Sequence, residues 1–373
     1  MSERRRLRVQ SLLPNQPLLR HLLAAGGGAV FFLAITLGLS AYRDFEMGEI
    51  ALYAIVLAGM SILTGVNGQI SLGHGGFMAV GAYTFAILQI HAPMPLGLEL
   101  IISMAASAAL GLMVAMPATR LRGPYLAGMT LILALGLPQL ADKYTATFGG
   151  DQGLATTAPT PPAGINAEQW LAWIEILCAL VVLVLLANLV RSRFGRSMRA
   201  VRDNEIAAAL AGIRVARTKV FAFVVSASCA GLAGAFLGLS TGVVNTGEFA
   251  LTLSLYLLAA MVLGGAGSLV GPWWGAVVLV YLPQWSTSIS KSFSLGNSVG
   301  ANLAVVIYGV VLIVVMLAAP SGVQGGLRWL GHRALRLGAA RSSPIIGVTT
   351  GIGPEAERPP SAPPTAEHER TNP

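Results

Sequence analysis

The sequence contains few charged residues, because Asp, Glu, Lys and Arg make up only 11% of its 373 positions. An ordinary soluble domain has about a quarter of its residues charged. Hydrophobic residues account for 54% and gather in blocks of 17 to 25, the length that a helix needs to cross a hydrocarbon layer about 30 Å thick. The composition therefore excludes a soluble protein and predicts a chain that crosses a membrane many times.

Cysteines, histidine clusters and nucleotide-binding loops are also scarce or missing. The two cysteines, Cys178 and Cys229, lie in apolar stretches without a CxxC pattern, which favours small buried hydrophobic residues over a disulfide or a metal site. The five histidines are too scattered to supply the cluster that a membrane-embedded enzyme needs. The phosphate-binding pattern GxxxxGK(S/T) is absent, so the chain does not hydrolyse ATP by that route. We therefore expect neither an enzyme nor a bound cofactor.

Ten apolar segments are separated by charges, prolines and glycine clusters. They show no period-2 alternation, so we expect an all-α polytopic membrane protein rather than a barrel. The third and ninth are entered through glycines and Pro283 interrupts the ninth, so each either spans or forms a re-entrant or broken helix. We interpret the first as a retained anchor rather than a cleaved signal peptide. The segments are 22–41, 48–64, 74–91, 96–117, 123–141, 169–190, 216–240, 249–266, 271–290 and 299–319.

The positions of Lys and Arg test this count independently. If the N-terminus is cytoplasmic, 21 of the 24 basic residues fall on the cytoplasmic side, as the positive-inside rule requires. This distribution explains the net charge of +8 without a nucleic-acid partner. Residues 1–21 then form a basic cytoplasmic N-terminus and residues 22–320 the transmembrane domain. Residues 321–373 form a cytoplasmic, largely disordered tail whose basic start lies on anionic lipid headgroups.

Acidic residues within or beside the apolar segments lie near their outer ends in this orientation. Carboxylates inside a membrane are costly and often belong to proton relays, but solvation at the end of a helix is the simpler interpretation here. The residues concerned are Glu49, Glu99, Glu168, Glu175 and Glu248.

A long polar segment, residues 191–219, separates the sixth and seventh apolar segments. Its sequence predicts a cytoplasmic helix that Asp203 or Asn204 caps and that Gly212 ends. Glu205 lies in the first turn, where the helix dipole favours an anion. Small side chains would let this helix enter a groove on another protein, whereas a basic loop that only fixes topology is the alternative. The small residues are Ala207, Ala208, Ala209 and Ala211.

The glycine-rich stretch 65–81 is the second polar feature. It places Gln69, Ser71 and His74 at or near membrane depth, where unpaired polar groups are costly and often functional. These residues, together with Gly75, are candidates for a translocation path beside a helix terminus. The commoner alternative is that the glycines permit close helix packing while His74 hydrogen-bonds a backbone carbonyl.

Four blocks of sequence, in order, resemble the permeases of ABC importers. The loop FGRSMRAVRDNEIAAALAGIRVARTKVFAFVVSA is most similar to that of branched-chain amino-acid permeases of the LivH and LivM kind. The other blocks are LTGVNGQISLGHGGFMAVGAY, RLRGPYLAGMTL and MVLGGAGSLVGPWWGA. The order of segments and the long loop fit the LivM-like branch better than the LivH-like one.

This resemblance implies an ABC importer permease fold in a bacterial inner membrane and a division of labour. A second, LivH-like permease would complete the pore, two cytoplasmic ATPase subunits would bind ATP, and a periplasmic binding protein would deliver a branched-chain amino acid. The loop helix would be the coupling helix that seats in an ATPase groove and moves as a rigid body. Its implied residues are Asn204, Glu205, Ala207, Ala208 and Gly212.

Two alternatives remain open at the level of sequence. A sugar or nucleoside permease of the same superfamily would share the segment pattern and the glycine motifs. A secondary transporter driven by an ion gradient would need an intramembrane ion pair or a carboxylate at a helix centre, and the sequence shows neither plainly.

Overall fold

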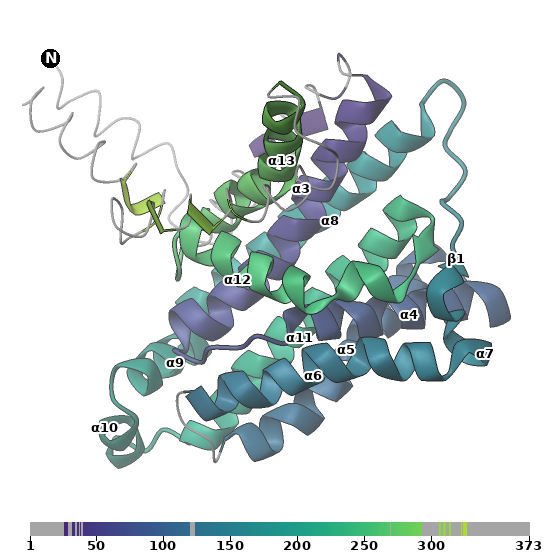
Figure 1. Ribbon diagram of the computed structural model, residues 1–373. Helices are drawn as coiled ribbons and strands as arrows, with labels where there is room; N and C mark the ends of the chain where they lie inside the picture. Colours follow the sequence, from purple (N-terminus) through teal and green to yellow (C-terminus); the bar gives the residue numbers. More distant parts are fainter. Residues whose placement is uncertain are drawn as a thin grey trace, which may run out of the picture. The chain divides into compact units, whose positions relative to one another are not determined.

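A computed structural model describes residues 40–119, 124–268 and 270–292, with a few isolated positions outside these ranges. This part of the chain is almost entirely helical (Figure 1). Its long helices are α3 (Ala41–Met60), α4 (His74–His91), α5 (Leu96–Ala118), α6 (Pro124–Lys143), α8 (Ala167–Arg191), α11 (Val215–Thr241), α12 (Leu251–Gly264) and α13 (Gly271–Ser292). The shorter elements are η1 (Ser61–Val66), α7 (Thr145–Phe148), η2 (Gly150–Gln152), β1 (Leu154–Ala155), α9 (Arg193–Asp203), α10 (Glu205–Leu210), β2 (Val243–Val244) and η3 (Thr246–Phe249).

The predicted all-α architecture is confirmed for the described residues, and eight of the predicted apolar segments coincide with helices. The first and tenth segments, 22–41 and 299–319, fall almost entirely outside those residues, as do the N-terminus 1–21 and the tail 321–373. The total of ten therefore stays a prediction. Within the described ranges, five helices are long and apolar enough to cross a membrane: Ala41–Val66, Leu96–Ala118, Tyr125–Lys143, Ala167–Arg191 and Val215–Thr241.

The start of the second segment differs from the prediction. Helix α3 begins at Ala41 rather than at residue 48, because the acidic residues of its first turns are buried and do not end the helix. Asp44 and Glu46 are 1% and 4% exposed. The hydroxyl of Tyr281 in α13 donates a 3.1 Å hydrogen bond to Glu46, which offsets part of the cost of burying that carboxylate.

The predicted interruption of the ninth segment is wrong. Helix α13 continues through Pro283 without a break. A proline removes one backbone donor, and a membrane helix tolerates that loss when neighbouring helices support it. Here α13 packs against both α3 and α12.

Helix α11 packs against α3, α4 and α5, and glycines bring its backbone close to theirs. A Cβ atom on Gly234 would collide with the backbone oxygen of Met78 in α4. A Cβ atom on Gly81 of α4 would collide with the backbone oxygen of Gly231. Lipid gives membrane helices no hydrophobic reason to associate, so small residues that allow such close approach stabilise their packing.

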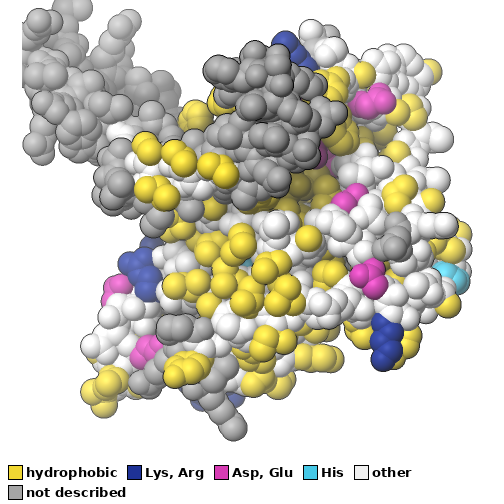
Figure 2. Space-filling model, in the orientation of Figure 1, with side chains coloured by type: hydrophobic (Ala, Val, Ile, Leu, Met, Phe, Trp, Pro, Cys, Tyr) yellow, Lys and Arg dark blue, Asp and Glu magenta, His cyan; other side chains and the backbone are white. Residues whose placement is uncertain are grey.

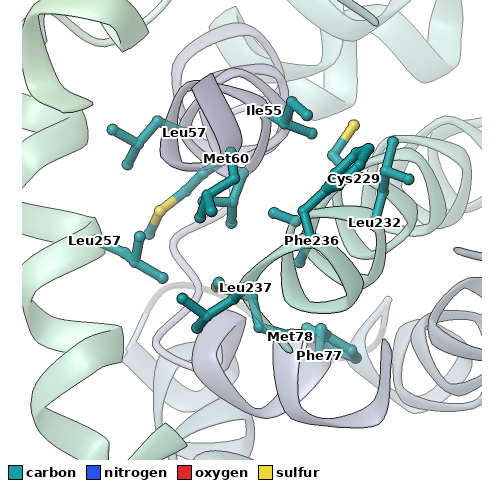
Figure 3. Close-up of a cluster of buried hydrophobic side chains, with 14 of the residues drawn as sticks. Ile55, Leu57, Met60, Phe77, Met78, Cys229, Leu232, Phe236, Leu237 and Leu257 are labelled. Carbon is teal, nitrogen blue, oxygen red and sulfur yellow. The ribbon is translucent and has the colours of Figure 1, made fainter. Parts of the chain in front are cut away.

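The core lies where four helices meet (Figure 3). Its side chains come from α3, α4, α11 and α12, which are far apart in sequence, and they point toward one another. Phe77 of α4 and Phe223 of α11 also meet edge to face, with ring centroids 5.7 Å apart, a favourable geometry for aromatic pairs. Completely buried members of this core are Ile55, Leu57, Met60, Met78, Phe236 and Leu257.

The outward sides of α5, α6 and α8 are hydrophobic. Met113, Ile132 and Leu185, one from each helix, are 68%, 71% and 62% exposed. Figure 2 shows a broad hydrophobic area with few charged side chains on the face drawn. Soluble monomers rarely expose such areas, so we interpret this surface as the part of the protein that faces a membrane interior.

Strands β1 and β2 lie at the end of the helices opposite α9 and α10 (Figure 1). Leu154 pairs with Val244 in an antiparallel register. Thr156 extends the contact, because its backbone N–H donates to the oxygen of Gly242 at 2.9 Å. The loop before α8 is thereby attached to the end of α11.

Candidate functional site

The predicted loop helix between the sixth and seventh segments is present as α10, and a second helix that was not predicted, α9, precedes it. Asn204 has an extended backbone that separates α9 from α10. Its side-chain oxygen accepts hydrogen bonds from the N–H groups of Ile206 and Ala207, both at 3.0 Å. Asn204 is therefore the cap of α10. Asp203, the other predicted cap, instead pairs with Arg202 at 3.3 Å.

Gly212 ends α10, as predicted. Its φ of 82° lies in the left-handed region that glycine adopts without strain. The N–H of Ile213 donates to the oxygen of Ala208 and that of Gly212 to the oxygen of Ala209, both at 3.0 Å. These two bonds form the Schellman motif, which satisfies carbonyls that a helix end otherwise leaves free. Helix α10 thus has defined bonds at both ends.

An ion pair holds α10 to the first turns of α11. Glu205 lies 2.5 Å from the ammonium group of Lys219. Lys219 is only 6% exposed, so this carboxylate provides the charge that its burial requires. The sequence placed Glu205 in the first turn of α10 but gave no sign that Lys219 is buried beneath it.

The exposed surface of α10 is apolar. Ile206 and Leu210 are 69% and 86% exposed, and their spacing of four residues puts them side by side on one face. Ala207 is exposed as well, whereas Ala208 is only 4% exposed and packs inward. Of the four small residues predicted to enter a groove, Ala209 and Ala211 are exposed like Ala207, and only Ala208 is unavailable to a partner. The two larger side chains, which sequence reasoning missed, provide most of the apolar surface.

The glycine-rich stretch begins with a break between two helices. The π-helical turn η1 ends at Val66, residues 67–73 are not helical, and α4 starts at His74. The side-chain nitrogen of Gln69 donates to the backbone oxygen of Lys219 at 3.2 Å. The hydroxyl of Ser71 accepts a longer hydrogen bond from the N–H of Gly73. Both polar side chains are buried and form hydrogen bonds within the protein.

At the start of α4, two hydrogen bonds link the chain to other helices. Nε2 of His74 lies 2.7 Å from the hydroxyl of Ser226 in α11. The N–H of Gly75 donates to the hydroxyl of Ser254 in α12 at 3.0 Å. The predicted partner of His74, a backbone carbonyl, is thus replaced by a hydroxyl. The structure brings the candidate path residues to the junction of α4, α11 and α12.

The prediction that these glycines permit close packing is confirmed. A Cβ atom on Gly73 would lie 2.7 Å from the backbone oxygen of Thr130 in α6. On Gly75 it would lie 2.7 Å from the hydroxyl of Ser254. Both distances are shorter than any ordinary contact, so a larger residue would displace the backbone of α6 at Gly73 or the side chain of Ser254 at Gly75.

Comparison with known proteins shows the family. The family model described as "Branched-chain amino acid transport system / permease component" matches residues 45–316, which contain the loop helices and the break. The chain belongs to this family. Like its relatives, it is a transport permease rather than an enzyme, as predicted.

Individual relatives of the permease agree with this assignment. The LivM permease proteins of the high-affinity branched-chain amino acid transport systems of Salmonella typhimurium (strain LT2) and Escherichia coli (strain K12) are each 28% identical over 296 residues. These matches cover 73% of the permease and 67% of each relative. The LivH permease protein of Salmonella typhimurium (strain LT2) is 25% identical over 293 residues, 73% of the permease and 91% of that protein. No solved structure matches the chain.

Among the residues that the structure describes, acidic side chains also line surface cavities away from the candidate path residues. One, of about 190 Å³, is lined by Glu168 and Glu175 of α8 and by Ser240 of α11. Another, of about 260 Å³, is lined by Gln89 and Glu99. Glu175 and Glu99 are 1% and 3% exposed. Their predicted solvation at helix ends is therefore wrong, because Ser240 donates to Glu175 and the N–H of Met94 donates to Glu99.

Glu248 is a partly buried carboxylate in η3, between α11 and α12. Asn245 accepts a 3.1 Å hydrogen bond from its backbone N–H and donates a 3.3 Å bond to Oε1. Oε2 is buried and has no partner among the residues that the structure describes. Burial raises the pKa of the Glu248 carboxyl from its ordinary value of 4.5 to about 7, because a buried charge loses its hydration.

Replacing this carboxyl should remove a pH dependence of stability. Because the pKa is raised in the folded permease, the folded state binds the proton more tightly than the unfolded state does. The associated stability is complete below pH 4.5 and is lost as the pH rises through about 7. We expect Glu248→Gln to unfold at a higher temperature than the wild type at pH 8 and at the same temperature at pH 4.5, measured in detergent. The exposed Glu168→Gln is the control, and identical pH profiles of wild type and Glu248→Gln would contradict the prediction.

Proposed function

We propose that this permease is one of two permease subunits in an ABC importer of branched-chain amino acids, and that α10 docks on an ATPase subunit. The observation that carries the proposal is the exposed apolar face of α10, formed by Ile206 and Leu210. A short helix that presents apolar residues four positions apart is suited to a hydrophobic groove on another protein. Relatives named as permeases of branched-chain amino acid transport systems support the substrate class.

The bonds around α10 suit it to transmit movement. Asn204 fixes its start, Gly212 ends it in a Schellman motif, and Glu205 ties it to Lys219 of α11. A push on the exposed face would therefore move α10 together with α11 rather than unwind it. Rigid elements that shift between packed arrangements are the usual carriers of such coupling.

The remaining parts of the importer follow from the family and from the charge distribution. The loop 191–219 and both termini would lie in the cytoplasm of a bacterium, with ten transmembrane or re-entrant helices crossing or entering the inner membrane. A LivH-like permease would pair with this chain, two ATPase subunits would bind the ATP, and a periplasmic protein would deliver the substrate. This chain itself would need no cofactor.

We also propose that the break before α4 lies beside the translocation path. Non-helical backbone at membrane depth is tolerated where protein buries it or where it lines a water-filled cavity. In the described conformation the polar groups of the break are bonded to α11 and α12. A relative shift of those helices would release them toward substrate. The residues concerned are Gln69, Ser71, His74 and Gly75.

The docking proposal is tested by placing a charge on the exposed face of α10. Burial of a leucine side chain contributes about 1.5–3 kcal/mol, so Leu210→Asp should weaken ATPase binding by about tenfold or more. Ile206→Asp should act alike. The measurement is co-purification of the ATPase subunits of the importer with the permease, together with uptake of labelled leucine in cells. Ala216→Asp, at an exposed site in the first turn of α11, is the matched control.

Three outcomes of these measurements distinguish docking of α10 on an ATPase subunit from the alternatives. Loss of ATPase binding and uptake in both α10 variants, with normal membrane levels, supports the proposal. Normal binding and uptake in both would overturn the docking assignment. Leucine uptake that persists without any ATPase subunit would instead indicate an ion-driven transporter.

A further inference from the structure

Arg202, the penultimate residue of α9, reaches across the fold to the end of another helix. Its guanidinium Nη1 donates a 2.6 Å hydrogen bond to the backbone oxygen of Gly65. Gly65 lies in the last turn of η1, where the final carbonyls of a helix lack partners within that helix. A positive charge at this position also interacts favourably with the helix dipole. Arg202 thus caps the combined helix α3–η1 from outside.

The aliphatic stem of Arg202 makes a second contact with the same segment. Gly68 has a φ of 78°, and a Cβ atom on it would lie 2.7 Å from Cγ of Arg202. Gly68 therefore has no side chain because the arginine occupies that space. The polar and apolar parts of one side chain together hold α9 against residues 65–68.

A parallel connection runs from α10 to the same place. Glu205 of α10 pairs with the ammonium of Lys219, and the backbone oxygen of Lys219 accepts from the side chain of Gln69. Both loop helices are therefore bonded to the few residues that lie between α3 and α4. A displacement of α9 and α10 therefore acts on this segment as well as on α8 and α11, against which these helices pack.

The segment is also attached to the turn between α12 and α13. The hydroxyl of Ser61 in η1 accepts from the N–H of Gly267 at 3.0 Å and donates to the oxygen of Ser268 at 3.2 Å. The backbone of Gly267 lies so close to Gly65 that a Cβ atom on Gly65 would collide with the backbone nitrogen of Gly267. One short π-helical turn thus joins the loop helices to α12 and α13.

Two features distinguish this turn from an ordinary end of a helix. A π-helical turn is rare and is frequent at functional sites. Asn67, directly after it, is 2% exposed, and its amide group has no hydrogen-bond partner within the described residues. A buried unpaired amide is costly, so a second arrangement that pairs this group would be favoured locally.

We propose that Arg202 is a positioning residue that transmits the movement of α10 to the break before α4 and to the α12–α13 turn. The inference rests on the proposed function, since it presumes that an ATPase moves α10. It adds the route: from α10 through α9 and the guanidinium of Arg202 to the carbonyl of Gly65. Docking and transmission are then separate properties, carried by different residues.

The test compares Arg202→Ala with Arg199→Ala in the complete importer. Arg199 lies on the same helix and donates to the backbone oxygen of Val190 near the end of α8. Its loss therefore removes a similar hydrogen bond from an arginine without affecting residues 65–69. Three quantities are measured in reconstituted vesicles: ATPase subunits retained, ATP hydrolysed, and labelled leucine transported per ATP. A hydrogen bond from a charged group is worth enough to change a conformational equilibrium by about tenfold or more.

We expect Arg202→Ala to retain the ATPase subunits and to hydrolyse ATP, while leucine transported per ATP falls by about tenfold. Arg202→Lys, which keeps a donor and a charge, should recover part of that ratio, and Arg199→Ala should keep the wild-type ratio. An unchanged ratio in Arg202→Ala would overturn the inference. Loss of the ATPase subunits would overturn it as well, since Arg202 would then serve docking.

If Arg202→Ala does not accumulate in the membrane, Arg202→Met decides by the same ratio, because it keeps an apolar stem beside Gly68 and removes the guanidinium donor. A normal ratio in that variant would overturn the inference. Failure of the docking proposal is recognised separately, because it appears in Leu210→Asp, which leaves Arg202 intact.

Discussion

Replacing Gly234 by leucine is expected to prevent the permease from folding. Any Cβ atom at this position collides with the backbone oxygen of Met78, so four extra carbon atoms would force α11 away from α4. Overpacking against a flexible side chain costs about 1–3 kcal/mol. Here the obstacle is backbone inside a completely buried core, and the cost should exceed that range. Because α11 also packs on α3 and α5, the whole arrangement would be lost.

The control for this prediction is Gly136→Leu in α6. No atom lies within 4 Å of a Cβ atom at Gly136, so the same chemical change meets open space. We expect normal amounts of monodisperse protein from Gly136→Leu in detergent and little or none from Gly234→Leu, measured by size-exclusion chromatography. Equal yields would show that α4 and α11 are not in backbone contact.

Much of the fold could be predicted because membrane helices are specified locally. Length and apolarity located α5 to within a residue at either end, and the glycines before His74 marked the start of α4. The start of α3 was missed because Asp44 and Glu46 look like residues outside a membrane, whereas the fold buries both. Burial of a charge depends on partners such as Tyr281, which lies 235 residues away from Glu46. No local pattern in the sequence reports such a contact.

In the candidate site, too, contacts between neighbouring residues were predictable and contacts between distant residues were not. The cap at Asn204 and the stop at Gly212 were predictable, because both depend on hydrogen bonds within a few residues. The depth of Lys219 and the bond from Arg202 to Gly65 were not, since the latter joins residues 137 positions apart. Which face of α10 is exposed was equally hidden, so sequence reasoning selected Ala208 and overlooked Leu210. The resemblance predicted a coupling helix in this loop, and the structure shows which bonds hold α10 in place.

Because Glu205 pairs with the buried Lys219, we expect loss of its carboxylate to destabilise the permease more than loss of a carboxylate at the protein surface usually does. In Glu205→Ala, the ammonium of Lys219, which is 6% exposed, loses its acidic partner. Removing one member of a buried pair destabilises by about 3–5 kcal/mol. Because the side chain of Glu205 is 35% exposed, water screens the pair, and about 2 kcal/mol is the reasonable expectation. The effect is measured as a lower unfolding temperature in detergent.

The double variant Glu205→Ala with Lys219→Met separates stability from coupling. Replacing the buried ammonium by an apolar side chain of similar length removes the uncompensated charge, so most of the lost stability should return. The tie between α10 and α11 does not return, because neither new side chain bonds the other. We therefore expect the double variant to unfold near the wild-type temperature and, like Glu205→Ala, to transport less leucine per ATP than the wild type. Recovery of both properties would show that the pair only stabilises the loop, and recovery of neither would show that Lys219 has a further partner.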